Sequence, residues 1–567
     1  MPDKKNYTGE ELCNLKNQLK TNSSIFISQW DTCRFFYKPQ TRADWIFTNN
    51  VPSKRVPQAT IGMRAKSILS SGLYSNTINL SDDFFSFTIT NKELAEDNNI
   101  KDYFAKCTEI AVEKLAASNY ALSTFETIDD YVVVGNGVQY SEMSKETKQL
   151  RFQNFMVNHV AIAENPDGKV DTVFRNFEMT AAQAYAKWGD KCPSCVKEAY
   201  ESVESRYDNF KFFHAAFPRQ LNYKDGESRP VPGDLVSPEN MKYCSYYVFE
   251  KDKEIIEEGG YNTFPYAVCR FQKNESNNPY GRSCSFDGIG SMQALSNLIA
   301  NLQDGIELKV NPPVFMPPGA SDQSDIDLTP GAYNFYDPMW GTPQFYQSDI
   351  DLGAGLTYKE ILQKEVMEIF YADLFLMLEE RKNMTATEVA ERVAEKVQSI
   401  LPVVARLYDE LYSTTLVRVF YLLLESNAFP PMPEELREVW GTNEIRVSYQ
   451  TKLDNKLKQL ELGQVVKTLQ ELALVYETKT NFPDIEASIK IDQLAKEIPR
   501  LNNVSPDVIK SDKETDLFYE AKAEAEQAAQ QQMAIDSNTK PLDLQAPVDP
   551  DSILAQTQGG LGGQQYF

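Results

Sequence analysis

The sequence predicts a mainly helical α+β fold of three or four packed sub-domains, and three observations support this. The chain has 567 residues, which is too long for one compact core. Apolar residues recur at three- and four-residue spacing over several long stretches, as amphipathic helices require. A separate stretch is rich in Tyr and Phe and interrupted by Pro, Gly and Asp, which is typical of strands.

The composition fits a soluble folded protein, and the net charge argues against tight binding of DNA. Apolar residues make up 42% and charged residues 24%, and the net charge is −24. Proteins that grip DNA gain most of their non-specific affinity by neutralising phosphates with basic side chains, so this acidic chain is not expected to bind DNA tightly. The charge does not exclude the passage of DNA, and many proteins are acidic only for solubility.

Cysteine usage and hydropathy indicate a protein made in a reducing cytoplasm, with no membrane span. The eight cysteines are scattered, so no disulfide framework is expected. The first residues contain no apolar signal-peptide core. The most apolar run, Leu416 to Leu424, is short and contains Arg418, so it cannot cross a membrane.

The first half of the chain reads as helices followed by strands. Residues 10–130 have helical periodicity, and Val132 to Val134 before Asn136-Gly137 suggest a strand entering a hairpin. Val170 to Phe177 is typical of another strand, and Thr180 is expected to open a helix that reaches Trp188. Residues 206–275 again read as strands.

The second half predicts three long helices. The first covers residues 285–309 and is stopped by Asn311-Pro312-Pro313. Thr357 and Glu360 form a capping-box pattern at the start of the second, residues 357–378. Thr385 and Glu388 form another capping box after a charged break, and that helix should continue to about Asn427.

Pro402 lies inside this third helix, where it must leave one carbonyl without its helical partner and bend the rod. The chain from 440 to 525 predicts a strand at Ile445 to Gln450 and then further helices. Beyond Glu526 the sequence turns to Gln, Gly and Pro, and we expect this tail to be disordered.

An acidic hexapeptide is repeated between the first two of these helices. Gln323 to Leu328 recurs as Gln347 to Leu352, and if extended each copy places two Asp on one face. Paired carboxylates could hold Mg²⁺ or Ca²⁺, but half-buried strands with wet acidic faces explain the pattern as well. Residues 310–358 contain six Asp and no Lys, Arg or Glu, which suggests a docking surface for basic partners or simple solubility. The four repeated carboxylates are Asp325, Asp327, Asp349 and Asp351.

No motif in the sequence supports an enzyme or a bound cofactor. There is no GxxxxGK[ST] loop, and Gly288-Ile289-Gly290 lacks a third glycine at dinucleotide-binding spacing. Cys192 and Cys195 have metal or redox spacing, but with only two histidines and no second CxxC a helix-capping loop is favoured. No Ser–His–Asp or Cys–His arrangement can be read either.

Several stretches, taken in order, resemble the portal (head-to-tail connector) family of short-tailed bacteriophages over residues 10–520. These stretches are Asn278 to Ser283 before the first long helix, Met384 to Val389 before the third, and Pro430 to Leu436 after it. Each is weak alone, but their order and spacing together are specific.

The resemblance implies a portal fold that assembles as a homododecameric ring. The implied parts are a wing (1–284), a descending stem helix (285–309), a clip (310–356), an ascending stem helix (357–378), a channel loop (379–384), a kinked wing helix (385–439), a crown (440–525) and a tail (526–567). The channel-loop residues that would face DNA are Glu380, Arg381, Lys382, Asn383 and Met384.

The resemblance also implies a function, which is to conduct double-stranded DNA during packaging and ejection at one capsid vertex of the virion. The implied partners are further copies of the chain, the terminase large subunit, tail adaptor and tail tube proteins, and the major capsid and scaffold proteins. Assembly in the cytoplasm of the host bacterium is expected. The alternative is another virion part, such as a tail adaptor or an internal scaffold component.

Overall fold

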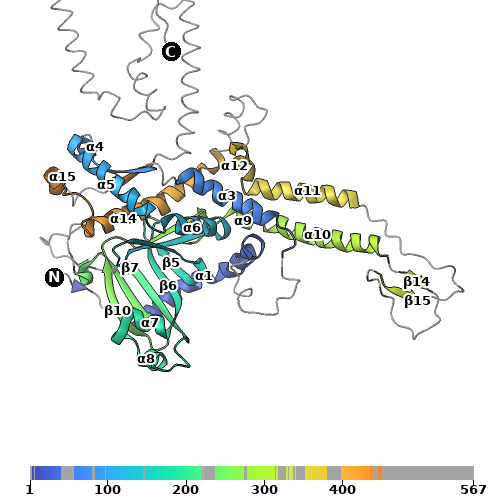
Figure 1. Ribbon diagram of the computed structural model, residues 1–567, viewed down its shortest axis with the longest axis horizontal. Helices are drawn as coiled ribbons and strands as arrows, with labels where there is room; N and C mark the ends of the chain where they lie inside the picture. The colour runs from blue at the N-terminus through green and yellow to red at the C-terminus, as the bar shows by residue number, and fades with distance from the viewer. Residues whose placement is uncertain are drawn as a thin grey trace, which may run out of the picture. The chain divides into compact units, whose positions relative to one another are not determined.

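The computed structural model is described over most of the first 449 residues. The described residues are 3–4, 7–39, 57–78, 84–95, 97–144, 147–219, 221–222, 237–273, 278–312, 352–379, 398–439 and 445–449, with short pieces between 314 and 339. All belong to the first of two units into which the chain divides, Met1–Leu460. Helices and strands are mixed within this unit, so the predicted α+β class is confirmed (Figure 1).

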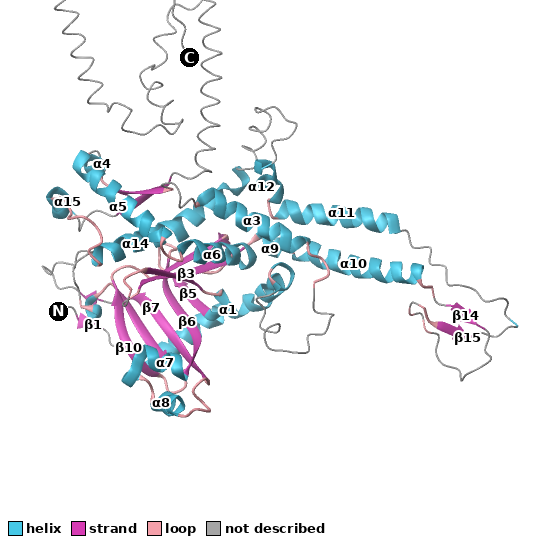
Figure 2. Ribbon diagram, in the orientation of Figure 1, coloured by secondary structure: helices cyan, strands magenta, loops and turns pink. Residues whose placement is uncertain are grey.

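Two antiparallel sheets form the strand-rich part (Figure 2). The larger has five strands in the order β10-β9-β7-β6-β5, and the smaller has three in the order β11-β3-β4. The strands of the larger sheet are β5 (Val160–Glu164), β6 (Val170–Thr180), β7 (Asn209–Pro218), β9 (Tyr243–Phe249) and β10 (Glu254–Tyr261). Those of the smaller sheet are β3 (Asn136–Met143), β4 (Leu150–Asn154) and β11 (Tyr266–Arg270).

Four two-stranded pairs complete the described strands. They join β1 (Asp3–Lys4) to β8 (Leu221–Asn222), β2 (Phe85–Ile89) to β16 (Ile445–Tyr449), β12 (Gln272–Lys273) to β13 (Gly281–Arg282), and β14 (Val314–Met316) to β15 (Tyr333–Phe335). The strand predicted at Ile445 is confirmed. It pairs antiparallel with β2, which ties the end of the described chain to its N-terminal part.

The helices lie mainly before and after the sheets. The N-terminal ones are α1 (Gly9–Tyr37), α3 (Ile61–Thr77), α4 (Lys92–Ala95), α5 (Asn98–Ala116) and α6 (Tyr120–Val134). The middle ones are α7 (Ala181–Trp188), α8 (Ser194–Glu201), α9 (Cys284–Asp287) and α10 (Ile289–Val310), and the later ones are α11 (Leu352–Ile369), α12 (Ala372–Glu379), α14 (Thr414–Glu425) and α15 (Glu434–Val439). None of the described helices is long and apolar enough to cross a membrane.

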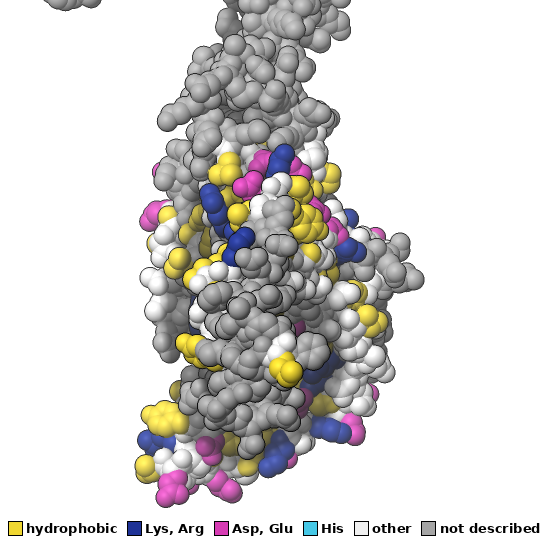
Figure 3. Space-filling model, turned by 90° about the vertical axis from the view of Figure 1, so that its right-hand side faces the viewer, with side chains coloured by type: hydrophobic (Ala, Val, Ile, Leu, Met, Phe, Trp, Pro, Cys, Tyr) yellow, Lys and Arg dark blue, Asp and Glu magenta, His cyan; other side chains and the backbone are white. Residues whose placement is uncertain are grey.

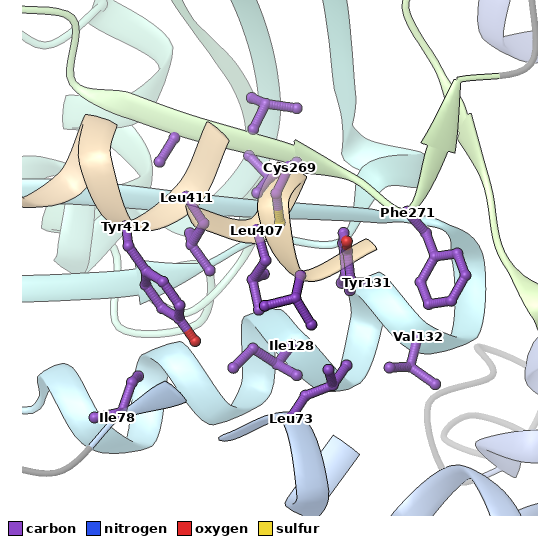
Figure 4. Close-up of a cluster of buried hydrophobic side chains, with 14 of the residues drawn as sticks. Leu73, Ile78, Ile128, Tyr131, Val132, Cys269, Phe271, Leu407, Leu411 and Tyr412 are labelled. Carbon is purple, nitrogen blue, oxygen red and sulfur yellow. The ribbon is translucent and has the colours of Figure 1, made fainter. Parts of the chain in front are cut away.

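One hydrophobic core joins the helices to the smaller sheet. It includes residues of α1, α3, α6, β3, β11 and the chain from Ile400 onward. Figure 4 shows part of it, where Leu407, Leu411 and Tyr412 point toward Ile128 of α6 and Leu73 of α3. Segments far apart in sequence therefore share one core, which fixes the later helices on the N-terminal ones.

The hairpin predicted at Asn136-Gly137 is wrong. Val132 to Val134 form the last turn of α6, and Gly135 closes that helix with φ 76°, a left-handed conformation that glycine adopts without strain. Asn136 then begins β3, and its side-chain oxygen accepts from the Gly281 N–H at 2.8 Å while its side-chain nitrogen donates to the Gly281 carbonyl at 3.2 Å. The valines suggested a strand, but their complete burial lets tertiary packing override β propensity.

The strand and helix predicted around Thr180 are confirmed. β6 covers Val170–Thr180, and α7 follows at once. Thr180 caps α7, because its hydroxyl accepts from the Gln183 N–H at 3.3 Å while the Gln183 side chain accepts from the Thr180 N–H at 3.1 Å. This reciprocal pair is a capping box.

The long helices of the second half begin and end at other residues than predicted. The helix expected at 285–309 is divided into α9 and α10, with Gly288 between them. The helix expected from Thr357 begins at Leu352, and the Thr357 hydroxyl donates back to the Gly353 carbonyl at 3.1 Å instead of capping. It ends at Ile369, and Tyr371, at φ 52°, separates it from α12.

Candidate functional site

Helices α10 and α11 form a hairpin, in which they lie side by side (Figure 1). Ser291 donates to the Glu365 carboxylate at 3.0 Å and links the two helices near one end. Gly355 lies so close to α10 that a Cβ there would be 2.6 Å from a methyl of Leu302. A side chain at position 355 would therefore require the Leu302 side chain to move.

Burial decreases along this hairpin. At the base, Met292 and Leu295 of α10 and Val366 of α11 are completely buried. Towards the other end, Leu356 is 50% exposed and Ile361 57%. Apolar side chains at this end therefore remain in contact with solvent in the single chain.

The exposed apolar side chains lie on both flanks of α11. Each helical residue turns the chain by about 100°, so the direction of Gly355, which faces α10, defines a reference. Leu356 then points about 100° to one side, and Tyr358 and Ile361 point about 60° and about 120° to the other. Tyr358 is 51% exposed. A helix with apolar groups on two opposite flanks can contact two different neighbours.

The exposed surface of α10 differs from that of α11 in charge. No charged residue occurs from Gly288 to Gln303, and those of α10 lie after it, whereas charged residues are spread along α11. They are Asp304, Glu307 and Lys309 in α10, and Lys359, Glu360, Lys364, Glu365 and Glu368 in α11. Viewed from the right-hand side of Figure 1, the described Lys and Arg side chains are interspersed with Asp, Glu and hydrophobic ones (Figure 3). The described part of this face therefore presents both signs of charge.

Asp327 is the one predicted clip carboxylate among the described residues, and it shapes a turn. Its Oδ1 accepts from the Thr329 N–H at 2.9 Å, and these hydrogen bonds from Thr329 lower the pKa of the fully exposed carboxyl. Its backbone is paired with the Asn334 side chain through two hydrogen bonds of 2.6 Å. Asp327 lies outside β14 and β15, and since most of both repeats falls outside the described residues, the strands considered for them stay a prediction.

The other predicted docking and channel residues lie outside the described part of the chain. They are Asp325, Asp349 and Asp351 of the acidic repeats and Glu380, Arg381, Lys382, Asn383 and Met384 of the predicted channel loop. Glu379, the first residue of the predicted channel loop, is described and is the last residue of α12.

Pro402 lies in a helical segment that is described from residue 398. The neighbouring Val403 carbonyl accepts a hydrogen bond of 2.8 Å from the buried Tyr131 hydroxyl, which ties the segment to α6. From Leu407 to Ser413 the helix continues as a π-helix, and then as α14. Among the described residues of this segment, the departure from α-helical geometry thus follows Pro402 in the chain.

An ion cluster holds the π-helical turn to the sheets, and sequence reasoning missed it. Arg270, at the end of β11, bonds Glu410 of the π turn and Glu164 of β5. Lys273 bonds the second oxygen of Glu164 at 2.8 Å. The two carboxylates are 140 and 106 residues from Arg270 in the chain, so no local pattern could have revealed the cluster.

The Cys192–Cys195 motif lies at the start of α8, as the helix-capping interpretation expects. The Cys192 thiol donates to the Ala184 carbonyl at 3.3 Å, and burial raises the pKa of both thiols. Within the described residues, no group of three or more His, Cys, Asp or Glu side chains could hold a metal ion.

Comparisons with known proteins agree with the resemblance in the sequence. The family model described as "Bacteriophage head to tail connecting protein" matches residues 10–509. The "Probable portal protein" of Bordetella phage BPP-1 is 26% identical over 527 residues, which cover 91% of each chain. The "Portal protein" of Salmonella phage epsilon15 is 24% identical over 574 residues, 98% of this chain and 99% of the relative.

The family match covers far more than half of the sequence and includes α10, α11 and the helix around Pro402. Both relatives span nearly the full length of this chain, and both are named as portal proteins. The protein belongs to the family of bacteriophage head-to-tail connecting proteins.

Proposed function

We propose that this chain is the subunit of a portal ring, a homododecamer at one capsid vertex through which double-stranded DNA enters and leaves the head. Family membership supports the portal role, and the exposed flanks of α11 support the ring. In a ring each subunit contacts one neighbour through one surface and the next neighbour through another. Leu356 on one flank and Tyr358 with Ile361 on the other suit such a two-sided contact.

Docking on the ring is proposed for the clip, residues 310–356. This segment has no Lys or Arg and its charge comes from Asp, so it would attract basic surfaces of the terminase large subunit and then of the tail adaptor and tail tube proteins. Contacts of the wing with the major capsid and scaffold proteins complete the proposal. The role is mechanical and requires no catalytic group.

The passage of DNA is proposed for the channel loop. Glu379 and Glu380 nearly balance Arg381 and Lys382, so the loop would touch phosphates without holding them tightly. Each exposed contact would contribute about 1 kcal/mol or less, because solvent and salt screen surface charges. A ring of such weak contacts suits a conduit in which DNA must slide.

A charge placed on one flank of α11 tests the proposed ring contact. Ile361→Glu puts a carboxylate where we propose that a neighbouring subunit packs, and burying an unpaired charge is costly. Sedimentation of the purified variant should therefore show monomers or small oligomers at concentrations where the unchanged protein forms rings.

Val203→Glu is the matched control, because Val203 is 85% exposed in the turn after α8, outside the hairpin. This variant should form rings like the unchanged protein. Rings of full size from Ile361→Glu would show that this flank is not a subunit contact.

A further inference from the structure

The helix that contains Pro402 has a π-helical turn at Leu407–Ser413. π turns are rare, occur mostly as single-turn bulges within α-helices, and are frequent at functional sites. Each residue of an α-helix adds about 1.5 Å of rise and about 100° of rotation. The wider turn therefore sets the rotational position of the residues before it, Pro402 included, relative to α14.

Arg270 binds this turn through several atoms. Its Nε lies 3.1 and 3.2 Å from the two carboxylate oxygens of Glu410, and its Nη2 also donates to Glu410. Its backbone N–H donates to the same carboxylate at 2.7 Å. The Arg270 side chain is 3% exposed and that of Glu410 13%, so solvent weakens these bonds little.

The same guanidinium is anchored on the sheet side. Its Nη1 donates to Glu164 at the end of β5, and its Nη2 donates to the Gly168 carbonyl at 3.0 Å. Burial alone would lower the pKa of Arg270, but Glu410 and Glu164 outweigh that effect and raise it, so the side chain stays charged. Arg270 thus connects one carboxylate of the sheet with one carboxylate of the helix.

Apolar packing holds the other side of the turn. Leu407 and Leu411 are completely buried and point toward α6 and α3 (Figure 4). The exposed pair of Lys169 and Asp409, 3.6 Å apart, adds little because surface ion pairs are weak. The turn is thus held between the apolar core and the buried bonds of Arg270.

We infer that Arg270 is a positioning residue, which fixes the rotational register of the Pro402 helix against the sheets by holding Glu410 in the π turn. A turn of α geometry would rotate the preceding residues by about 100°, so without these bonds two registers can compete. Only the consequence for DNA rests on the proposed function. The predicted channel-loop residues precede the Pro402 helix in the chain, so the register of that helix would affect how they meet DNA.

Glu410→Gln and Glu164→Gln form a matched pair that tests the inference. Each variant removes one carboxylate charge from the same buried guanidinium and leaves it the other; Glu410 also accepts from the Arg270 N–H, and Glu164 also accepts from Lys273. Hydrogen exchange of the full-length protein should be faster by about tenfold in residues 403–413 of Glu410→Gln than in those of Glu164→Gln. Equal protection of this segment in the two variants would overturn the inference.

A second measurement separates this inference from the proposed function. Host cells that supply either variant to a phage lacking its own portal gene are scored for rings, full heads and empty heads. Glu410→Gln should form rings but yield several-fold fewer full heads than Glu164→Gln. Equal yields together with unequal exchange would overturn the link from register to DNA handling. If the unchanged protein forms no rings, the proposed function fails, whereas the exchange result stands by itself.

Discussion

Single residues of the core are held by hydrogen bonds whose direction can be worked out. The Glu142 carboxylate can only accept hydrogen bonds, so the Tyr140 hydroxyl, 3.1 Å away, donates to it. Tyr140 must then accept from Tyr261, 3.0 Å away, and Ser245 donates to Tyr261 at 3.4 Å. The Ser245 hydroxyl has one proton, which it donates to Tyr261, so it must act as the acceptor in its hydrogen bond with His214.

This chain of bonds fixes the state of His214. Its Nε2 lies 2.9 Å from the Ser245 oxygen and must be the donor, so its Nδ1 accepts from the Tyr266 hydroxyl at 2.6 Å. A neutral imidazole meets both demands. Burial, followed by the charges of Arg175 and Lys187, holds the pKa of His214 well below its ordinary value.

A dependence of stability on pH follows from His214. In the unfolded chain a histidine titrates near about 6.5, so below that pH the unfolded state binds a proton that the folded state excludes. The free energy of unfolding should fall as the pH drops below about 6.5, by up to about 1.4 kcal/mol per pH unit. Urea unfolding between pH 5.5 and pH 7.5, chosen as roughly the range in which histidine titrates, measures this slope.

His214→Gln is the variant that isolates this effect. It should be less stable than the unchanged protein at the upper end of the range, because bonds to Tyr266 and Ser245 are lost. Its stability should nevertheless depend less on pH. A slope as steep as that of the unchanged protein would show that His214 is not the group responsible. His159→Gln serves as the comparison, since His159 is exposed whereas His214 is completely buried.

The acidic residues of the clip give a second prediction at this scale. Replacing Asp325, Asp327, Asp349 and Asp351 with Asn removes four charges per subunit, and Asn at 327 can still accept from the Thr329 N–H. Binding of the terminase or the tail adaptor should weaken and lose its dependence on salt, since charge complementarity acts largely through the association rate.

A salt series of binding measurements checks this prediction. Unchanged affinity at every salt concentration would leave solubility as the reason for the acidic composition. A requirement for added Mg²⁺ or Ca²⁺ in the unchanged protein would instead favour a metal site at these carboxylates.

At the scale of elements, local patterns predicted those features, such as helix caps, whose partners lie a few residues apart in the sequence. The capping box at Thr180 was predictable because its two partners are three residues apart. Thr357 and Glu360 show the same pattern, yet α11 begins at Leu352, and Gly355 in the added turn lies close to Leu302. A capping pattern indicates where a helix can begin, and tertiary contacts decide whether it does.

The remaining elements could not be predicted because their causes are distant in the sequence. Glu410 of the π turn is bound by Arg270, 140 residues away, and α6 continues through three valines because the core encloses them. Of the candidate site, the two helices were predicted from periodicity and their pairing from the family resemblance, while the exposed flanks of α11 needed the structure. Whether Pro402 bends its helix at a point that matters for DNA stays a prediction.

The channel loop gives the prediction for this scale. Arg381→Ala with Lys382→Ala should leave ring assembly intact, because we propose that these side chains face DNA and not a neighbouring subunit. Packaging efficiency or retention of DNA should fall, since each subunit loses two weak phosphate contacts. Counting full and empty heads from infected cells measures the effect.

Glu379→Ala with Glu380→Ala is the control, as it removes charges of the other sign from the same segment. It should not reduce the retention of DNA. Normal numbers of stable full heads from the Arg381 and Lys382 variant would refute a DNA-facing role, and a failure to form rings would show that the loop is structural.

At the scale of the whole molecule, the proposed ring repeats the surface of one chain in every subunit. The net charge of −24 would be repeated in every subunit, so a ring would repel DNA phosphates except where basic side chains lie close to them. In a ring, the two apolar flanks of α11 would contact a neighbour on each side of every subunit. The proposed ring would bury these flanks, which are exposed in the single chain.

Imaging of the purified full-length protein by electron microscopy tests the central claim most directly. Head-to-tail contacts close into a ring only when the rotation between neighbours divides a full turn. The account predicts closed rings of one chain with a hole along the axis, about wide enough for a DNA duplex of roughly 20 Å, and with the hairpins of α10 and α11 packed between neighbours. Monomers, open filaments or rings without an axial hole at micromolar concentration would contradict it.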